Sequence, residues 1–280
     1  MGVVYRARDL ELERTVAIKT LPRVAPRSAA LLRREARAMA RLQHANLAVI
    51  HSMESWRGVP VLVMEYLAGG TLADRIREGP LPVRDVVEAG SMIGGVLHRV
   101  HRAGLLHRDI KPSNIGYTGE GVVKLLDFGL VELVANLSSR STMSADLGDA
   151  TPRAPRPDVG PAPDPRHSTG EAARVAGTFA YLSPEAMAMG TPAHGFDLWA
   201  LAVTLFEALA GRNPFIAPTL TETRRRIAGA VVPDLREQRP ECSPALAGFF
   251  ASALALDSSR RPHSAADFVT RLRAASAAER

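Results

Sequence analysis

Short runs of β-branched residues open the chain, and longer stretches with helical periodicity follow them. Residues 2–7 and 15–21 are short and rich in β-branched side chains, and the charged segment 9–13 separates them, which predicts an antiparallel hairpin. Residues 28–42 place apolar side chains on one helical face, behind a serine that is a favoured N-cap residue, and predict a helix. Two further strands are predicted over residues 47–52 and 59–66. The first quarter of the chain is therefore expected to form a small β-rich lobe.

The pattern becomes helical after residues 67–70, which contain two glycines and are expected to form a flexible link. A second short hairpin is predicted at 115–126, with residues 119–121 as its turn. The remaining apolar runs have helical spacing and predict helices over 71–78, 83–104, 183–189, 196–210, 219–229, 243–256 and 264–275. This layout predicts an α+β fold with a small N-terminal lobe (1–66) and a larger helical lobe (67–280).

One long segment, residues 138–172, shows no apolar period. Six of the 18 residues from Ala150 to His167 are proline, which favours a disordered or polyproline-like conformation. A loop of this length inside a compact domain is usually either functional or disordered. We therefore expect an insertion that belongs to neither lobe.

The basic charge of the chain is concentrated at its N-terminus. Residues 1–46 contain ten Lys or Arg and four acidic residues, so they account for the whole net charge of +6. A basic end can bind nucleic acid or anionic lipid, but a solvated helix face explains the same pattern. A single aromatic residue, Tyr5, lies among these arginines, which makes a base-stacking surface a poor interpretation. We expect no nucleic-acid partner.

The rest of the composition is that of an ordinary globular protein, with 46% hydrophobic and 23% charged residues. The single cysteine, Cys242, excludes an intramolecular disulfide. The longest apolar run, Leu198 to Ala210, contains Glu207 and is too short to span a bilayer. Residues 1–14 lack the apolar core of a secretory signal. These features predict a soluble, cytoplasmic protein without a membrane span in this chain.

Lysine is rare in this sequence. Only Lys19, Lys111 and Lys124 are lysine, and the other 32 of the 35 basic residues are arginine. A lysine that remains against such a bias can mark a position that needs a compact ammonium group, where a planar guanidinium would not fit. Three positions are thus singled out before any motif is considered, and we interpret Lys124 as structural.

Residues 107–114 (HRDIKPSN) and 127–129 (DFG) follow two neighbouring predicted elements, and two such loops can converge on one point. Asn114 and Asp127 offer hard oxygen ligands of the kind that suits Mg²⁺. Asp109 can accept a hydroxyl proton, and Lys111 can neutralise a transferring phosphoryl group. The pattern predicts a phosphoryl-transfer site.

These motifs resemble the signature set of the eukaryotic-type serine/threonine protein kinases found in bacteria. The resemblance extends from Gly2 to Arg261. It implies a two-lobed protein kinase fold and transfer of the ATP γ-phosphate to Ser or Thr hydroxyls of protein substrates. It also implies ATP and Mg²⁺ as cofactors. Lys111 within its loop is typical of the serine/threonine type.

The resemblance assigns further residues to the nucleotide site. Lys19 of the sequence VAIK is implied to hold the α/β-phosphates, with Glu35 as its ion-pair partner. Met64 is implied to lie behind the adenine, and the backbone of Glu65 to Leu67 to bind it. The nucleotide-binding residues implied in this way are Gly2, Val4, Ala17, Lys19, Glu35, Met64, Glu65, Leu67, Asn114 and Asp127, of which Asn114 and Asp127 are the metal ligands.

Other matches are implied to support the site. The segment from Gly177 to Glu185 resembles the platform for the peptide substrate, and Arg261 is implied to pair with Glu185. Asp197 is implied to anchor the catalytic loop, and His107 to pack against the phenylalanine of DFG rather than act as a base. We expect all of these residues except the platform to be scaffolding.

The chain departs from the family in two places. Only the last glycine of the phosphate-covering loop, Gly2, is present, so the preceding strand and two glycines are absent from this sequence. We expect Met1 to be internal to a longer gene, and we expect partial loss of the loop to weaken ATP binding, because the reaction depends on positioning. Relatives often continue after the last helix, which leaves room for a C-terminal membrane anchor outside this chain.

The second departure is the length of the segment between Asp127 and Glu185. Arg108 precedes the catalytic aspartate, and in this family such an arginine often pairs with a phosphate. Ser168 and Thr169 are the preferred autophosphorylation candidates, and self-association for phosphorylation in trans is a corresponding prediction. The simpler alternative is a serine-rich linker.

Three alternatives to an active protein kinase stay open at this stage. A non-catalytic pseudokinase or scaffold would explain the absent strand and glycines but not the complete set of catalytic residues. A small-molecule phosphotransferase shares the fold but usually lacks the GT and SPE motifs present here. Nucleic-acid binding by the basic N-terminus is the least favoured.

Overall fold

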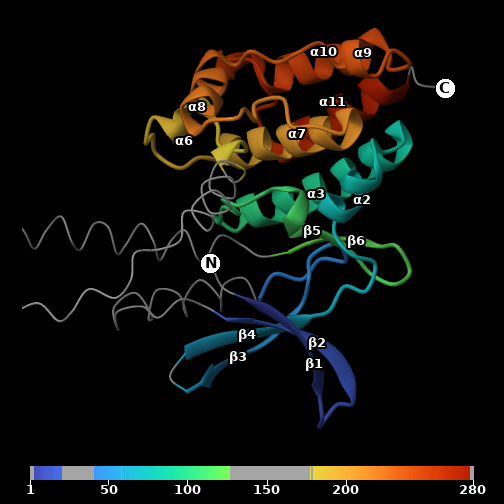
Figure 1. The fold of residues 1–280 in the computed structure, drawn as a ribbon, viewed down its shortest axis with the longest axis vertical. Coiled ribbons are helices and arrows are strands. Elements are labelled where there is room, and N and C mark those ends of the chain that lie inside the picture. Colours follow the sequence, from blue (N-terminus) through green and yellow to red (C-terminus); the bar gives the residue numbers. More distant parts are fainter. Residues whose placement is uncertain (1–2, 21–40, 58, 127–176, 178, 278–280) are drawn as a thin grey trace, which may run out of the picture.

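The computed structural model describes residues 3–20, 41–57, 59–126, 177 and 179–277. Its first four strands form one antiparallel sheet in the order β1-β2-β4-β3, and most helices form a separate, larger lobe (Figure 1). The two short strands β5 and β6 lie between the sheet and the helices (Figure 1). The predicted α+β fold with two lobes is confirmed by this arrangement.

The predicted N-terminal hairpin is present as β1 (Val4–Asp9) and β2 (Arg14–Thr20). The carboxylate of Asp9 accepts hydrogen bonds from the backbone of Glu11 and Leu12 and so stabilises the turn. β2 also pairs with β4 (Val59–Glu65), which in turn pairs with β3 (Ile50–Trp56). The inner strands β2 and β4 contain the buried apolar residues of the sheet, because only they have a neighbour on both sides.

The strand predicted over residues 47–52 is misplaced. Its first residues do not join the sheet, because the backbone of residues 46–48 bonds instead to β6 (Val123–Leu125). Leu125 N donates to Asn46 O at 2.8 Å, and Ala48 N donates to Leu125 O at 3.0 Å. The strand β3 therefore starts only at Ile50. A periodicity along the chain could not show which of two partners the backbone would choose.

Residues 67–70, predicted to be a flexible link, are held by hydrogen bonds. Gly69 N donates to Tyr117 O and Tyr117 N donates to Gly70 O, both at 2.9 Å. A Cβ at Gly69 would collide with the carbonyl oxygen of Thr118, and Gly70 has a φ of 72°. Both glycines are thus needed for the backbone to pass close to β5 (Ile115–Tyr117) rather than for mobility.

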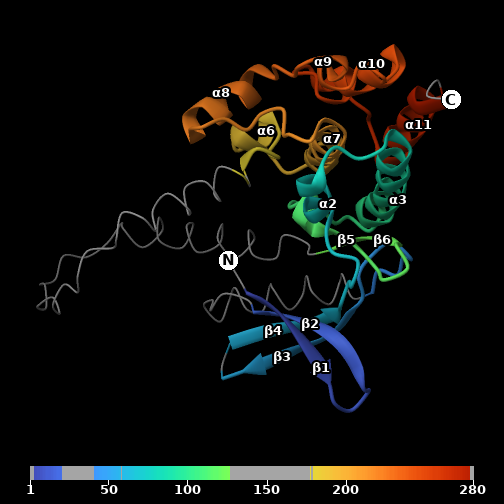
Figure 2. The same cartoon turned by 45° about the vertical axis from the view of Figure 1, so that its right-hand side comes forward.

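Two helices follow this link. The helix α2 (Leu72–Glu78) begins at a capping box in which Thr71 and Asp74 bond reciprocally. The helix α3 (Val83–Arg102) buries one face against α7 (His194–Ala210) and against α11 (Ala265–Ser276), which lies beside it (Figure 2). The second hairpin consists of β5 and β6 (Val123–Leu125), as predicted.

The remaining helices match the predicted positions to within a few residues. They are α6 (Pro184–Met187), α7 (His194–Ala210), α8 (Leu220–Gly229), α10 (Pro244–Ala253) and α11 (Ala265–Ser276). The short helices η1 (Pro112–Asn114) and η2 (Ser258–Arg260) were not predicted. One further turn of helix, α9 (Leu235–Gln238), was not predicted. A single turn capped by Asp234 is too short to show a period.

The core of the molecule centres on α7. Apolar residues are buried all around this helix, including Trp199 and Phe206, which is why the sequence there reads as one apolar run. The same core continues through Leu47 and Leu125 to Leu62 and to other residues of the sheet. Of the helices in the described residues, none is both long enough and apolar enough to cross a bilayer.

Two predicted segments fall outside the described residues. They are the helix at 28–42, except for its last two positions, and the Pro-rich insertion at 138–172.

Candidate active site

The loop between α3 and β5 brings three of the predicted site residues together. Lys111 Nζ lies 2.7 and 2.9 Å from the two carboxylate oxygens of Asp109. The amide nitrogen of Asn114 donates to the same carboxylate at 2.8 Å and to the backbone oxygen of Asp109 at 2.7 Å. The one-turn helix η1 makes this possible, because it folds Asn114 back over the aspartate. The arrangement fixes one carboxylate between an ammonium group and an amide.

The strand that precedes Asp127 is attached to this loop. Leu126 N donates to Asn114 O at 2.8 Å, and Leu126 O lies 2.8 Å from the imidazole nitrogen Nε2 of His107. Leu126 directly precedes Asp127 in the chain. Both hydrogen bonds therefore hold the backbone that leads to Asp127 next to Asn114, as the two motifs predict.

His107 lies fully buried beneath the loop and has a defined tautomer. Its Nδ1 accepts from Asp109 N at 3.3 Å, so its Nε2 carries the proton and donates to Leu126 O. Both ring nitrogens are occupied by backbone groups, which fits the predicted structural role rather than that of a base. Its predicted contact with Phe128 lies outside the described residues.

Asp197 anchors the loop from the start of α7. Its carboxylate accepts from the backbone of His107 (2.9 Å) and Arg108 (2.8 Å), and it lies 2.8 Å from Nε2 of the buried His101. Arg108 has a φ of 67°, a region that is unfavourable for residues other than glycine. The hydrogen bonds to Asp197 offset the cost of this backbone conformation, so the predicted anchoring role is consistent with the structure.

The charge of Asp197 is stabilised by these donors. Burial on its own would raise the pKa of this carboxyl, but the hydrogen bonds from His101 and from the two backbone N–H groups outweigh it. The pKa of Asp197 is therefore below its usual value, and the group is ionised at neutral pH.

The sheet places several predicted nucleotide residues on paired positions. Val4 lies opposite Lys19 in the β1–β2 pair, and Ala17 lies opposite Met64 in the β2–β4 pair. Ala17 and Met64 are both buried. Val4, Ala17, Lys19 and Met64 thus gather in the sheet, next to the segment that leads to the larger lobe.

The hinge segment, residues 65–67, connects the two lobes. Glu65 ends β4, and its carboxylate is 2.8 Å from Lys124 Nζ of β6. Leu67 lies against Gly116 of β5, where a Cβ on the glycine would overlap the leucine side chain. The structural interpretation of Lys124 is thus correct in that it forms an ion pair between two elements.

The residues at the end of the predicted peptide platform are also fixed. Arg261 donates to both carboxylate oxygens of Glu185, at 3.0 and 2.8 Å, and its guanidinium lies 4.6 Å from the centre of the Trp199 ring. Ser183 caps α6 by accepting from Ala186 N. The predicted pair of Glu185 and Arg261 is present and holds this part of the chain against α7.

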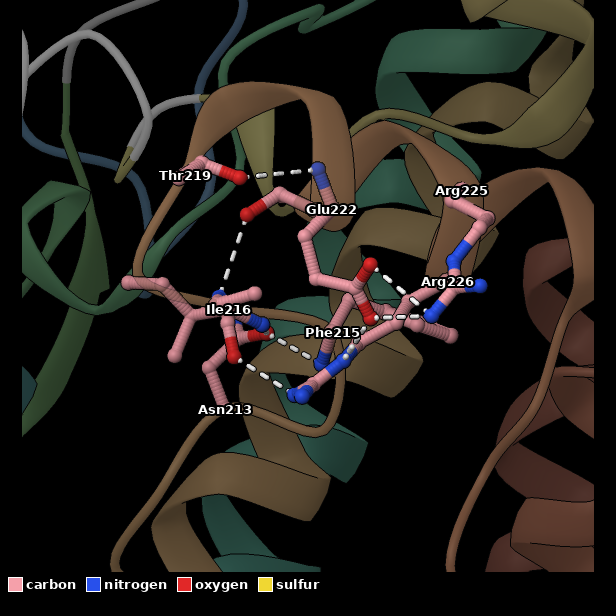
Figure 3. Close-up of polar contacts among 9 residues, drawn as sticks. Asn213, Phe215, Ile216, Thr219, Glu222, Arg225 and Arg226 are labelled. Atoms are coloured by element: carbon pink, nitrogen blue, oxygen red, sulfur yellow. Dashed lines mark hydrogen bonds and ion pairs between the residues drawn. The ribbon is translucent and has the colours of Figure 1, made fainter.

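A second polar cluster was missed in the sequence. Tyr181 donates to the Glu207 carboxylate at 2.6 Å, and Asn213 donates to the same oxygen at 3.1 Å. The oxygen of the Asn213 side chain accepts from the backbone of Phe215 and Ile216 (Figure 3). A glutamate inside an otherwise apolar run was the available signal, because a buried carboxylate needs donors.

The same loop is connected to α8. Arg226 donates to Ile216 O at 2.9 Å, and Glu222 pairs with both Arg225 and Arg226 (Figure 3). Thr219 caps the helix by accepting from Glu222 N. Tyr181, which precedes the SPE motif, is therefore connected through Glu207 and Asn213 to a loop that α8 supports.

We expect Tyr181→Phe to destabilise the protein by about 1.5–3 kcal/mol at neutral pH, since it removes a hydrogen bond to a largely buried carboxylate. Burial raises the pKa of Glu207, and the Tyr181 hydrogen bond counteracts this by stabilising the charged form. The loss should therefore shrink as pH falls and the carboxyl of Glu207 becomes protonated.

Urea denaturation of both proteins at pH 7 and near pH 4 measures this difference. Tyr5→Phe, at an exposed position of β1, is the matched control and should change neither value. An equal loss for Tyr181→Phe at the two pH values would contradict the assigned role of the Glu207 charge.

Five predicted site residues lie outside the described residues: Gly2, Glu35, Asp127, Ser168 and Thr169. Lys19 interacts with other groups of the protein. The Lys19–Glu35 pair remains a prediction, because Glu35 lies outside the described residues.

The sequence matches the family model described as the protein kinase domain over residues 1–271. It is 36% identical over 218 residues to the serine/threonine-protein kinase PknL of Mycobacterium tuberculosis, covering 76% of this chain and 47% of that protein. It is 32% identical to the serine/threonine-protein kinase pkn3 of Myxococcus xanthus, covering 98% of this chain and 47% of that protein. The chain thus spans about half the length of these curated relatives.

Solved structures agree with the fold. The kinase domain of Mycobacterium tuberculosis PknI superposes with a TM-score of 0.68 at 23% identity, and the match covers 98% of this chain and 91% of that one. The matched family model and the bacterial sequence relatives show that the chain belongs to the protein kinase family, as a catalytic domain of the bacterial eukaryotic-type serine/threonine kinases.

Proposed function

We propose that this chain transfers the γ-phosphate of ATP to serine or threonine hydroxyls of protein substrates, in an Mg²⁺-dependent reaction. The observation that carries the proposal is the fixed group of Asp109, Lys111 and Asn114, in which one carboxylate lies between an ammonium and an amide. Phosphoryl transfer requires little more of a protein than such positioning and charge stabilisation.

Asp109 orients the substrate hydroxyl and accepts its proton. Lys111, within 2.9 Å of that carboxylate, neutralises negative charge on the phosphoryl group as it passes to the hydroxyl. In the structure, the two side chains pair with each other and remain only partly buried. They are thus accessible to a substrate, and an arriving phosphate would compete for the ammonium group.

The oxygen donors near Leu126 fit Mg²⁺. Asn114 directs its amide nitrogen to Asp109, which leaves its amide oxygen for a cation, and Asp127 would add a carboxylate. An amide and a carboxylate oxygen are ligands that Mg²⁺ accepts. When bound, the ion would neutralise charge on the phosphates. The protein holds Asn114 next to Leu126, the residue before Asp127.

Lys19 would hold the α/β-phosphates with Glu35 as its partner, and the backbone of residues 65–67 would bind adenine. Gly2 and Val4 would cover the phosphates, while Ala17 and Met64, which are paired across β2 and β4, would enclose the base. The domain would act in the cytoplasm, where ATP is available.

Arg108 is the proposed regulatory residue. It is exposed and held in a fixed backbone conformation by Asp197, so a phosphate on Ser168 or Thr169 could pair with it. Phosphorylation in trans between two copies of the chain would supply that phosphate.

The proposal is tested by incubation of the chain with Mg²⁺ and ATP, followed by mass spectrometry of its peptides and of a serine-containing protein substrate. We expect phosphate on Ser or Thr residues of the protein, and no phosphate with Asp127→Ala, because that variant lacks a metal ligand. Asp85→Ala, which removes an exposed carboxylate of α3 outside the proposed site, is the matched control and should behave as the unmodified chain. Absence of transfer from the unmodified chain would favour the scaffold alternative.

A further inference from the structure

Two of the three lysines in the chain have a proposed role in the chemistry, but Lys124 does not. Its ammonium group lies 2.8 Å from the carboxylate of Glu65, and the two side chains are only 13% and 24% exposed. Glu65 is separated from Lys124 by 59 residues and belongs to the other sheet. The pair is therefore a long-range contact rather than a surface ion pair within one element.

Glu65 is fixed to a second segment as well. Its backbone N–H donates to Val49 O at 2.9 Å, and its carboxylate accepts from Val49 N at 3.1 Å. The side chain of Asn46, three residues earlier, donates to Val123 O at 2.8 Å. Leu125 N donates to Asn46 O, as described above.

These contacts form a closed ring. Glu65 bonds to Val49, Asn46 bonds to β6, and Lys124 of β6 pairs with Glu65. We refer to Asn46, Val49, Glu65 and Lys124 as the clasp. A ring of this kind resists changes in the distance between its members more strongly than a single contact, because several bonds must be lost together.

The clasp joins two parts of the proposed site. Glu65 begins the hinge segment whose backbone would bind adenine, and Lys124 lies three residues before Asp127. We propose that Lys124 is a positioning residue, which holds the hinge segment and the strand before Asp127 at a fixed separation and so places the Mg²⁺ ligands relative to the nucleotide. This inference rests on the proposed function.

The rarity of lysine in the chain supports this assignment. Arginine occupies 32 of the 35 basic positions, yet this one is lysine. The ammonium group is compact and can approach one carboxylate that already accepts a backbone N–H, whereas a planar guanidinium requires more space.

The test compares Lys124→Met, Lys124→Arg, Glu65→Gln and the double variant Glu65→Gln/Lys124→Met with the unmodified chain. We measure kcat and the Mg²⁺ concentration that gives half-maximal rate. In parallel, calorimetry measures binding of adenylyl imidodiphosphate with and without Mg²⁺. Arg271→Met, which breaks a partly exposed ion pair with Asp267 on α11, is the matched control.

We expect Lys124→Met to lower kcat about tenfold and to raise the half-maximal Mg²⁺ concentration several-fold, since small misplacements of reacting groups have large effects on rate. Lys124→Arg should recover part of the loss. The double variant should be no worse than either single variant, because both changes remove the same contact. A loss of folded protein alone would lower the rate without changing the Mg²⁺ dependence.

The positioning role would be overturned if Lys124→Met left the half-maximal Mg²⁺ concentration unchanged, or if the losses of the two single variants added up in the double variant. Either result would leave the kinase activity of the unmodified chain intact. The calorimetric measurement gives the same comparison without turnover. If the unmodified chain neither transfers phosphate nor binds the nucleotide analogue, the proposed function itself fails, and this inference fails with it.

Discussion

Asp109→Asn should lower the rate of phosphate transfer by about 10²–10⁴-fold, the contribution that a positioned proton acceptor usually makes. The substitution keeps the shape of the side chain, and its amide oxygen can still contact Lys111. It removes the negative charge and one acceptor, so the substrate hydroxyl loses both its orientation and its base. The rate is measured with saturating Mg²⁺ and ATP and a serine-containing substrate.

The fold should survive this change, because Asp109 is partly exposed and its backbone is held by Asn114 and His107. Asp85→Asn, at an exposed position of α3, is the control and should leave the rate unchanged. A rate for Asp109→Asn within a few-fold of the unmodified chain would remove Asp109 from the mechanism.

Asp197→Ala should give the largest loss of stability, about 3–5 kcal/mol, as expected when one member of a buried charged network is removed. Three donors lose their acceptor at once: the backbone N–H groups of His107 and Arg108, and the ring of His101. Arg108 also loses the support for its unfavourable φ, so the catalytic loop should become disordered and activity should fall with stability.

The sign of the pH effect follows from the lowered pKa of Asp197. A carboxyl whose pKa is lowered on folding contributes stability above its unfolded value of 3.8, and this contribution is lost as pH falls through the folded value. The difference in free energy of unfolding between the unmodified chain and Asp197→Ala should thus reach its full value at pH 7 and become smaller below about pH 4.

Thermal or urea denaturation at the two pH values checks this expectation. Asp197→Asn should lose less than the alanine variant, because its amide oxygen still accepts from one backbone N–H while its amide nitrogen faces the other. Asp267→Ala, which removes a partly exposed ion pair on α11 and a hydrogen bond from His263 N, is the comparison and should lose much less stability than Asp197→Ala. Equal stability of the Asp197 and Asp267 variants would contradict the anchoring role.

The sequence by itself determined those features that depend on local order. The β1–β2 hairpin follows from short β-branched runs around a charged turn, and most helices follow from apolar residues at helical spacing. The order of the HRDIKPSN and DFG motifs identified Asp109, Lys111 and Asn114 as neighbours, because their spacing within one loop leaves few ways to separate them.

Only the tertiary structure decided which distant segments would share hydrogen bonds. Residues 46–49 could have extended β3, but their backbone bonds to β6 and to the end of β4, which moved the strand and created the clasp around Glu65 and Lys124. Glu207 read as an interruption of an apolar helix until Tyr181 and Asn213 were found beside it. In each case the free energy comes from pairing a buried polar group with a partner far along the chain, and a pattern of residue types along the chain cannot specify that partner.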